Sequence, residues 1–242
     1  MKIGIISDIH GNLQALRAVL DALDAEGVVK ILCTGDIVGY GAYPEQCVEL
    51  VRERGILAVR GNHDDMVAHS GREIMLRAEV RKAISWTREQ LSEEMIEWLG
   101  NLPMEAQYAG LDLVHSSHVF RPEWHYVMDQ RSITANFLFQ TSSLAFNGHT
   151  HLPLVGIHTR GQRPRLVMFR EFSLPKDNRY LINVGSVGQP RDRNPDAAFV
   201  TYETRDRRVK LHRVQYDVAT AQRAIRNADL PAFFAERLAD GR

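Results

Sequence analysis

Aspartate, histidine and asparagine residues occur in small clusters along the first part of the chain, and each cluster follows an apolar run. Asp8 and His10 follow KIGIIS, Asp36 follows VVKILC, and Asn62 and His63 follow ILAVR. Carboxylate oxygens, amide oxygens and imidazole nitrogens can all bind divalent metal ions. Taken one at a time, such residues are more typical of turns and helix N-caps. Their repetition after successive apolar runs favours a shared metal site.

Three more histidines follow later apolar runs in the same way. His115 follows LDLV, and His149 and His151 follow LAF in the stretch NGHTH. Side chains two residues apart in an extended segment point to the same side, so His149 and His151 can act at one place. The spacing alone leaves open whether they bind one ion or two.

The segments that must position these residues read as strand, turn and helix in series. KIGIIS and VVKILC are each followed by a Gly-containing turn and then by a stretch of helical periodicity. Asp36 lies 28 residues after Asp8, and Asn62 lies 26 residues after Asp36, which predicts βαβ units and a parallel sheet. Because the carboxyl ends of parallel strands lie at one edge of a sheet, we expect the clusters to meet there.

The rest of the chain predicts helices and further strands. Residues 64–103 read as a helical insertion and residues 104–116 as a β-hairpin. From residue 144 onward, short β-rich segments joined by Gly, Pro, Asn and Asp turns predict a mostly antiparallel sheet. Residues 217–242 read as a helical tail. With no evident linker, residues 1–242 are expected to form a single domain.

Composition argues against two classes of partner. Basic and acidic residues balance at 30 each, so the long-range attraction typical of nucleic-acid or membrane-surface binders is not expected. No apolar run approaches the roughly 18 residues of a spanning helix, and the N-terminus lacks a secretory signal pattern. Cys33 and Cys47 read as buried packing residues without a metal-ligand spacing. We therefore expect a cytoplasmic protein that binds neither membranes nor nucleic acids.

These residues, in this order, resemble the motifs of the calcineurin-like metallophosphoesterase family. The motifs are D-x-H at Asp8 and His10, G-D at Asp36, G-N-H-D at residues 61–64, a lone His115, and G-H-x-H at residues 148–151. The resemblance implies an α/β fold, a four-layer α/β/β/α sandwich of two mixed β-sheets flanked by helices. It also places the β-rich segments after residue 151 in the second sheet.

The resemblance further implies two divalent metal ions. One ion would be held by Asp8, His10, Asp36 and His151, and the other by Asp36, Asn62, His115 and His149. Asp36 would bridge the two ions, whereas His149 and His151 would bind different ones. The mixture of nitrogen and oxygen ligands favours transition-metal ions (Mn, Fe, Zn, Co or Ni) over Mg or Ca.

Such a centre would act on phosphate esters. Two divalent cations and two aspartates leave about two positive charges, which an anionic phosphate would balance. The resemblance implies metal-dependent hydrolysis of a phosphate mono- or diester by a hydroxide bound to both ions. His63, not a ligand by this resemblance, would be the catalytic general acid that protonates the leaving oxygen. The expected substrate is a small phosphorylated molecule, with nucleotides among the candidates.

Two positions distinguish the chain from the serine/threonine protein phosphatase branch of that family. That branch has G-D-x-V-D-R-G where this chain has GDIVGYG, so Gly39 and Tyr40 replace its Asp and Arg. The chain is more similar to small bacterial and archaeal phosphodiesterase-type members. The replacement also leaves His63 without an identified partner.

Two further residues are candidates for substrate binding. Arg191, in GQPRD, has a guanidinium that suits a phosphate, although a surface pair with Asp192 is the alternative. His118 lies three residues after His115 and is a candidate lining residue. Two other functions stay open: a non-catalytic binding scaffold with the same fold, and a nuclease, which the balanced charge disfavours.

Overall fold

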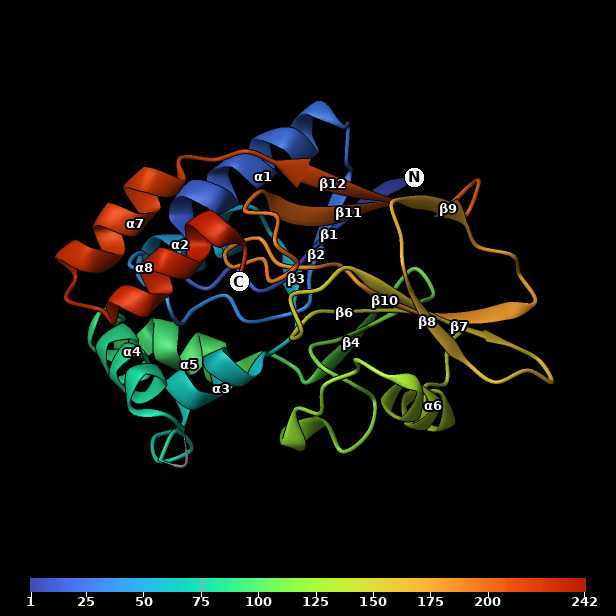
Figure 1. Ribbon diagram of the computed structural model, residues 1–242, viewed down its shortest axis with the longest axis horizontal. Helices are drawn as coiled ribbons and strands as arrows, with labels where there is room; N and C mark the ends of the chain where they lie inside the picture. Colours follow the sequence, from blue (N-terminus) through green and yellow to red (C-terminus); the bar gives the residue numbers. More distant parts are fainter. Residues whose placement is uncertain (75) are drawn as a thin grey trace.

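The computed structural model describes residues 1–74 and 76–242, whose strands form two six-stranded sheets (Figure 1). The first sheet contains, in spatial order, β3 (Leu57–Ala58), β2 (Lys30–Cys33), β1 (Lys2–Ile6), β11 (Ala197–Glu203), β12 (Arg208–Val214) and β9 (Glu171–Ser173). The second contains β4 (Glu105–Tyr108), β5 (Leu111–Val114), β6 (Leu144–Asn147), β10 (Asn178–Asn183), β7 (Leu154–Thr159) and β8 (Arg165–Met168). Both sheets mix parallel and antiparallel neighbours.

The opening strands form the predicted parallel units. β1 pairs with β2 and β2 pairs with β3, in each case in parallel. Helix α1 (Leu13–Ala25) begins after Asn12, whose side chain accepts a hydrogen bond from the Ala15 N–H at 3.1 Å. Helix α2 (Pro44–Glu53) begins with proline, which suits the first helical position because it lacks an N–H. The carboxyl ends of β1, β2 and β3 therefore lie at one edge.

Three later strands lie in the first sheet, so the prediction that they belong to the second was wrong. β11 pairs antiparallel with β1, from Lys2 opposite Glu203 to Ile5 opposite Val200. β12 and β9 continue the sheet beyond β11. β1 pairs with β2 along one edge only, and β11 occupies its other edge. The predicted hairpin is confirmed as β4 and β5, which pair antiparallel.

Hydrophobic side chains fill the spaces between four layers. Ile3 and Ile5 of β1 point into a core between the two sheets, whereas Ile6 packs with α1 and α2 on the outer face of the first sheet. Successive side chains of a strand point to opposite faces, so β1 serves both cores. Helix α6 (Gln130–Phe139) packs Ile133 against the outer face of the second sheet. This confirms the α/β/β/α sandwich of two mixed sheets.

Helices also occupy the segments that read as helical at positions 64–103 and 217–242. They are α3 (Asn62–Ala68), α4 (Ala78–Glu89), α5 (Glu93–Asn101), α7 (Val218–Asn227) and α8 (Ala232–Asp240). α3 contacts α4 and α5, while α7 contacts α8 and α1 (Figure 1). No helix in the described part of the chain combines the length and apolar character needed to cross a membrane.

Candidate metal centre

The seven predicted metal-binding residues meet at one edge of the sandwich, where five strands end. They are Asp8 and His10 after β1, Asp36 after β2, Asn62 after β3, His115 after β5, and His149 and His151 after β6. All but Asn62 are buried. Because β1, β2 and β3 belong to one sheet and β5 and β6 to the other, both sheets contribute to the site.

The first group of side chains contains Asp8, His10 and His151, whose ligand atoms all lie within 4.8 Å of one another. His10 Nε2 is 3.1 Å from His151 Nε2, and Asp8 Oδ1 is 3.2 Å from His151 Nε2. Asp36 Oδ2 is also near this group, 3.7 Å from His10 Nε2. These are the four residues expected to hold one ion.

The second group contains Asp36, His115 and His149, again within 4.8 Å of one another. His115 Nε2 is 3.4 Å from Asp36 Oδ2 and 3.0 Å from Asn62 Oδ1. His149 Nε2 is buried and has no hydrogen-bond partner in residues 1–74 and 76–242. Asp36 lies between the two groups, because its Oδ2 is close both to His10 Nε2 of the first group and to His115 Nε2 of the second.

The proton positions in the first group indicate that a cation fits there. Nδ1 of His10 faces the Val38 carbonyl at 3.2 Å, and Nδ1 of His151 faces the Gln189 carbonyl. A carbonyl only accepts hydrogen bonds, so each Nδ1 carries the proton and each Nε2 presents a lone pair. Burial lowers the pKa of both imidazoles, which favours these neutral forms. Two facing lone pairs repel each other unless a cation lies between them.

In the second group, the contacts of His115 favour a protonated imidazole. Nδ1 of His115 bonds to the Thr34 carbonyl at 2.8 Å, so its Nε2 faces two oxygen acceptors, from Asn62 and Asp36. Burial opposes a charge on His115, but the nearby carboxylates, Asp36 first, outweigh it and raise its pKa to about 9. Without a metal, a proton therefore satisfies these acceptors, and proton and metal compete for the same nitrogen. Burial, and next the charge of His115, lower the pKa of His149 to about 3.

The backbone at the site is strained in a way that fits a functional role. Five of the seven residues have left-handed φ values: Asp8 at 52°, His10 at 49°, Asp36 at 54°, His149 at 68° and His151 at 60°. Such a conformation costs a non-glycine residue on the order of 1 kcal/mol or more, and it persists only where the surrounding structure enforces it. Strain of this kind concentrates at functional sites.

Asp64 holds the loop that carries Asp36. Its carboxylate accepts backbone N–H bonds from Asp36 and Ile37, each at 2.9 Å, and from Val38 at 3.2 Å. It also accepts the N–H of Gly61 at 3.0 Å, at the start of α3. The fourth residue of the G-N-H-D motif therefore fixes the loop that carries Asp36.

Asp8 connects the two sheets directly. Its carboxylate accepts the backbone N–H of His149 at 3.0 Å, and its carbonyl accepts the Ser186 hydroxyl at 2.8 Å. A Cβ atom at Gly148 would collide with Asp8 Oδ2 and with Ser7 Oγ. The glycine of G-H-x-H is therefore required for this close approach between the loops of β1 and β6.

His63 lies beside the first group and belongs to neither of the two predicted sets of four ligands. One of its ring nitrogens is within 4.8 Å of ligand atoms of His10 and Asp36. Its backbone N–H donates to Asp36 Oδ1 at 2.8 Å. Nδ1 is buried without a hydrogen-bond partner among the described residues. Burial is the main cause that lowers the pKa of this imidazole to about 4.

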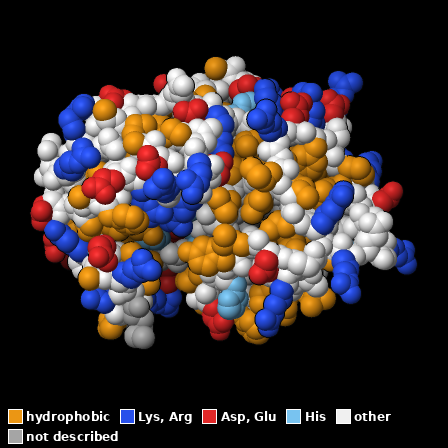
Figure 2. Space-filling model, viewed as in Figure 1, with side chains coloured by type: hydrophobic (Ala, Val, Ile, Leu, Met, Phe, Trp, Pro, Cys, Tyr) orange, Lys and Arg blue, Asp and Glu red, His pale blue; other side chains and the backbone are white. Residues whose placement is uncertain are grey.

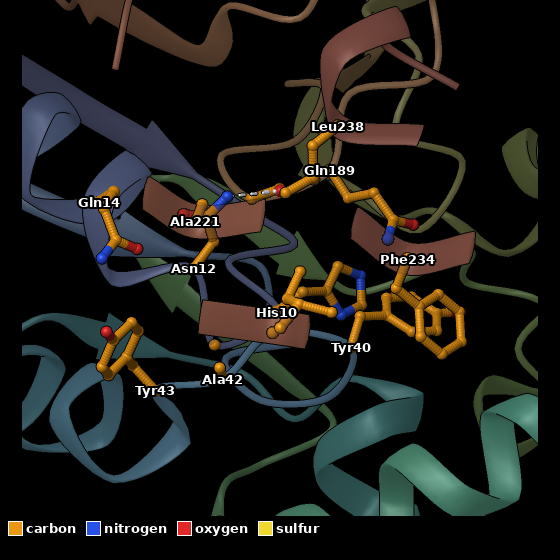
Figure 3. Close-up of a pocket in the computed structure, with 14 residues that line it drawn as sticks. His10, Asn12, Gln14, Tyr40, Ala42, Tyr43, Gln189, Ala221, Phe234 and Leu238 are labelled. Atoms are coloured by element: carbon orange, nitrogen blue, oxygen red, sulfur yellow. Dashed lines mark hydrogen bonds between the residues drawn. The ribbon is translucent and has the colours of Figure 1, made fainter. Parts of the chain in front are cut away.

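Tyr40 fills the place next to His63 where the protein phosphatase branch has arginine. Its ring lies 4.4 Å from the His63 ring and 4.5 Å from the His10 ring, measured between centroids. On its other side it contacts Phe234 of α8 at 4.6 Å (Figure 3). Helix α8 therefore packs against the ring that lies beside His10 and His63, and no sequence motif marks this helix.

Replacing Gly39 with Ala is expected to destabilise the chain and disturb His63. A Cβ atom at Gly39 would lie 2.5 Å from His63 Nδ1, and φ there is +107°. Gly161→Ala is a matched control, because Gly161 has φ +77° but no atom within 4 Å of the new Cβ. We expect thermal melting to show a loss of about 2 kcal/mol or more for Gly39→Ala and about 1 kcal/mol for Gly161→Ala. Equal losses would show that the His63 contact is unimportant.

The two predicted substrate-binding residues lie in different surroundings. The Arg191 backbone N–H donates to the His151 carbonyl at 3.4 Å, and its guanidinium donates to Gln189 Oε1 at 3.0 Å. The alternative surface pair is not formed, because Asp192 pairs with Arg213 instead. No ion pair to Arg191 occurs within the described ranges, so its charge remains available beside His151.

His118 points away from the centre. Its Nδ1 is 3.2 Å from Asn136 Oδ1, and its Nε2 is 3.7 Å from Asp112 Oδ2. The backbone N–H also donates to Asn136 Oδ1, at 2.9 Å. These contacts lie between β5 and α6 and account for the side chain, so the structure gives no support to its expected role in substrate binding.

Arg237 of α8 is a basic residue whose guanidinium donates to the Arg242 carbonyl and lies 4.9 Å from the centroid of the Phe233 ring. Burial, and next the charge of Arg191, lower the pKa of its guanidinium to about 10, and Tyr40 and Tyr126 oppose this shift. Figure 2 shows Lys and Arg side chains gathered near α8 and the C-terminus, beside a hollow in the surface. The residue lies in the helical tail, outside every motif, so no signal in the sequence marked it.

Comparison with known proteins identifies the family of the chain. A family model described as the calcineurin-like phosphoesterase superfamily domain matches residues 1–207. The chain therefore belongs to the calcineurin-like phosphoesterase superfamily. It is 37% identical to an uncharacterized protein of Methanocaldococcus jannaschii, over 99% of this chain and 98% of that one. The family binds divalent metals, and the two Asp/His groups are suited to that role.

Two further comparisons bear on fold and substrate. The crystal structure of a metallophosphoesterase from Sphaerobacter thermophilus superposes with a TM-score of 0.86 at 38% identity, covering 100% of this chain and 99% of that one. A symmetrical bis(5'-nucleosyl)-tetraphosphatase of Aliivibrio salmonicida is 26% identical over 123 residues, which is 50% of this chain and 45% of that protein.

Proposed function

We propose that the chain is a divalent-metal-dependent phosphoesterase that hydrolyses a phosphate mono- or diester of a small nucleotide. The observation that supports this best is the pair of adjacent buried Asp/His groups, with Asp36 Oδ2 3.7 Å from His10 Nε2 on one side and 3.4 Å from His115 Nε2 on the other. Proteins bury several acceptors face to face only where a proton or cation joins them. The family membership gives the reaction class.

We assign the proposed ligands to two ions, one at each group. One ion would be held by Asp8, His10, Asp36 and His151, and the other by Asp36, Asn62, His115 and His149. When bound, two divalent ions would polarise phosphoryl oxygens and make a nearby water a better nucleophile. The donor set of four imidazoles, two carboxylates and one amide suits Mn, Fe, Zn, Co or Ni.

His63 is proposed to donate the proton that the leaving oxygen requires. Its position beside the first group places it near a phosphate bound at the centre. Burial favours the neutral imidazole in the free protein, as its low pKa indicates. An anionic phosphate next to the ring would stabilise the protonated form, so substrate binding itself would prepare the acid.

Arg191 is proposed to bind a non-bridging phosphate oxygen. The Gln189 side chain and the His151 carbonyl hold it beside the first group. A guanidinium offers two parallel N–H donors to a phosphate. A nucleotide substrate is supported by the partial similarity to a bis(5'-nucleosyl)-tetraphosphatase, which the name of that protein describes.

Removal of metal is expected to abolish hydrolysis. After dialysis against a chelator, the rate with 4-nitrophenyl phosphate and bis(4-nitrophenyl) phosphate should fall at least about a hundredfold, because the metals supply several kcal/mol of charge stabilisation. Adding Mn²⁺ should restore it, and elemental analysis of the restored protein should give two ions per chain. Unchanged hydrolysis after chelation would contradict the proposal, as would a protein that binds no transition metal.

A further inference from the structure

A groove of about 600 Å³ opens beside the second group of the metal centre. Asn62 and His149 form part of its lining. Ligand pockets typically measure roughly 300–1,000 Å³, so the groove has room for a nucleoside. On the other side of the centre, the cavity beside His10, Tyr40 and Phe234 measures only about 10 Å³ (Figure 3), which is space for no more than a water molecule. A group attached to a phosphate at the centre therefore has room on the His149 side.

One wall of the groove consists of aromatic side chains from the segment between β5 and α6. Tyr126 stacks on His149 with ring centroids 4.1 Å apart and an interplanar angle of 23°. Trp124 meets His115 edge to face, at 5.7 Å and 74°. Tyr126 remains 50% exposed, so its contact with His149 leaves ring surface free to stack on a ligand. Figure 2 shows hydrophobic side chains gathered over this segment.

The helical insertion supplies a second part of the lining. Met66 of α3 and Leu76 contribute apolar surface to it. The lining also contains Asp65 and Arg72, which form an ion pair. Their charges cancel, yet Arg72 is half exposed and still offers N–H donors. The groove therefore has no net charge from this pair and is lined by aromatic, apolar and polar side chains.

We propose that this groove binds the planar aromatic base of a nucleotide whose phosphate lies at the metal centre. Tyr126 and Trp124 would stack on the base, and Met66 and Leu76 would cover its other face. Arg72 and Asp65 would offer a donor and an acceptor to the base edge. This inference rests on the proposed phosphoesterase function and assigns the substrate class to that same site.

The shape and charge of the groove favour a base over other groups. A flat ring gains from offset stacking on an aromatic side chain, which an alkyl chain does not. A groove without net charge from this pair gives no advantage to a charged group such as a second phosphate. Met side chains, which are flexible and polarizable, pack well on planar aromatic rings.

Two ligands that differ only by the base provide the test. Adenosine 5'-monophosphate and ribose 5-phosphate should be titrated calorimetrically into the full chain loaded with Mn²⁺. We expect the wild-type protein to bind adenosine monophosphate about tenfold or more tightly than ribose phosphate, because base stacking on aromatic residues has an effect of that size. In Tyr126→Ala, the affinity for adenosine monophosphate should fall about tenfold, while that for ribose phosphate stays unchanged.

Matched variants separate stacking from other effects. Tyr126→Phe keeps the ring and should keep the preference for the base. Phe139→Ala removes an equally exposed aromatic ring, 49% exposed, that does not line the groove, and should also keep the preference. Trp124→Ala, on the same wall, should weaken the preference as Tyr126→Ala does.

Equal wild-type affinities for the two ligands would overturn the inference. So would an equal loss of affinity for both ligands in Tyr126→Ala, which would mean that Tyr126 only positions His149. Hexyl phosphate serves as an alkyl probe, and its binding more tightly than adenosine monophosphate would also overturn the inference. A chain that shows the base preference but no metal-dependent hydrolysis would contradict the proposed function and leave the groove assignment intact. Metal-dependent hydrolysis without a preference for the base would support the proposed function and contradict the groove assignment.

Discussion

Asp36→Asn is expected to empty both metal positions and to lower kcat/KM for phosphate ester hydrolysis by about a thousandfold or more. Asp36 Oδ2 lies 3.7 Å from His10 Nε2 and 3.4 Å from His115 Nε2, so this carboxylate is shared by the two groups. An asparagine amide carries no negative charge, so its oxygen is a far weaker ligand for two cations than the carboxylate oxygen. Elemental analysis and steady-state kinetics measure the two effects.

A buried carboxylate outside the centre gives the matched control. Asp112 of β5 is buried, and its Oδ1 accepts a hydrogen bond from Gln107 at 2.9 Å, which an asparagine at that position can also accept. Asp112→Asn should keep the metal content and the rate of the wild-type chain. If Asp36→Asn were folded and still held two ions, the bridging role would be wrong.

The second large effect is expected for His63→Ala, which should lower kcat by about 10²–10⁴-fold while two ions stay bound. His63 is buried beside His10 and Asp36, and its Nδ1 has no hydrogen-bond partner in the described ranges. A side chain that donates a proton can be removed without removing a ligand. Single-turnover kinetics with an aryl phosphate and elemental analysis of the same sample measure the two quantities.

The same geometry also allows the opposite outcome. His63 and His10 each place a ring nitrogen within 4.8 Å of an Asp36 oxygen, so His63 is close enough to be a ligand. Loss of metal in His63→Ala would assign it that role and remove the proposed acid. His10→Ala should lose metal, and His158→Ala, in β7 outside the centre, should change neither quantity.

The positions of the candidate ligands could be predicted because parallel strands impose them. Once residues 2–33 read as a βαβ unit, Asp8 and Asp36 had to lie at the same edge, and the structure places them there. The resemblance to the family motifs added the later histidines, and in the structure His115 and His149 follow β5 and β6 of the second sheet. Local patterns and motif order together predicted which side chains lie close to one another at this edge.

The membership of the later strands could not be predicted in this way. β11 is buried along almost its whole length, which is compatible with either sheet. Its partner, β1, lies about two hundred residues earlier, and local periodicity carries no information about such a pairing. The insertion predicted at residues 64–103 is also not helical throughout: α4 begins at Ala78, and Arg77 lies outside the helix. Met75, within the predicted insertion, lies outside the described residues.

Contacts made by backbone atoms and by the helical tail at residues 217–242 could also not be predicted from the sequence. The carbonyls of Thr34, Val38 and Gln189 fix the imidazole tautomers, and any residue type could supply them. Sequence proximity misled for His118, because the chain turns after His115 and directs the later ring toward Asn136. Helix α8 reaches the site through the contact of Phe234 with Tyr40, which no motif encodes.

The contribution of both sheets to one centre has a consequence for folding. The loops of β1, β2 and β3 meet those of β5 and β6 at the centre, where the Nε2 atoms of His10 and His151 face each other at 3.1 Å and several residues have strained backbones. An ion that binds only after the two sheets have come together would add its binding free energy to the stability of the native chain. The proposed cofactor would then stabilise the packing of the two sheets, as well as take part in the reaction.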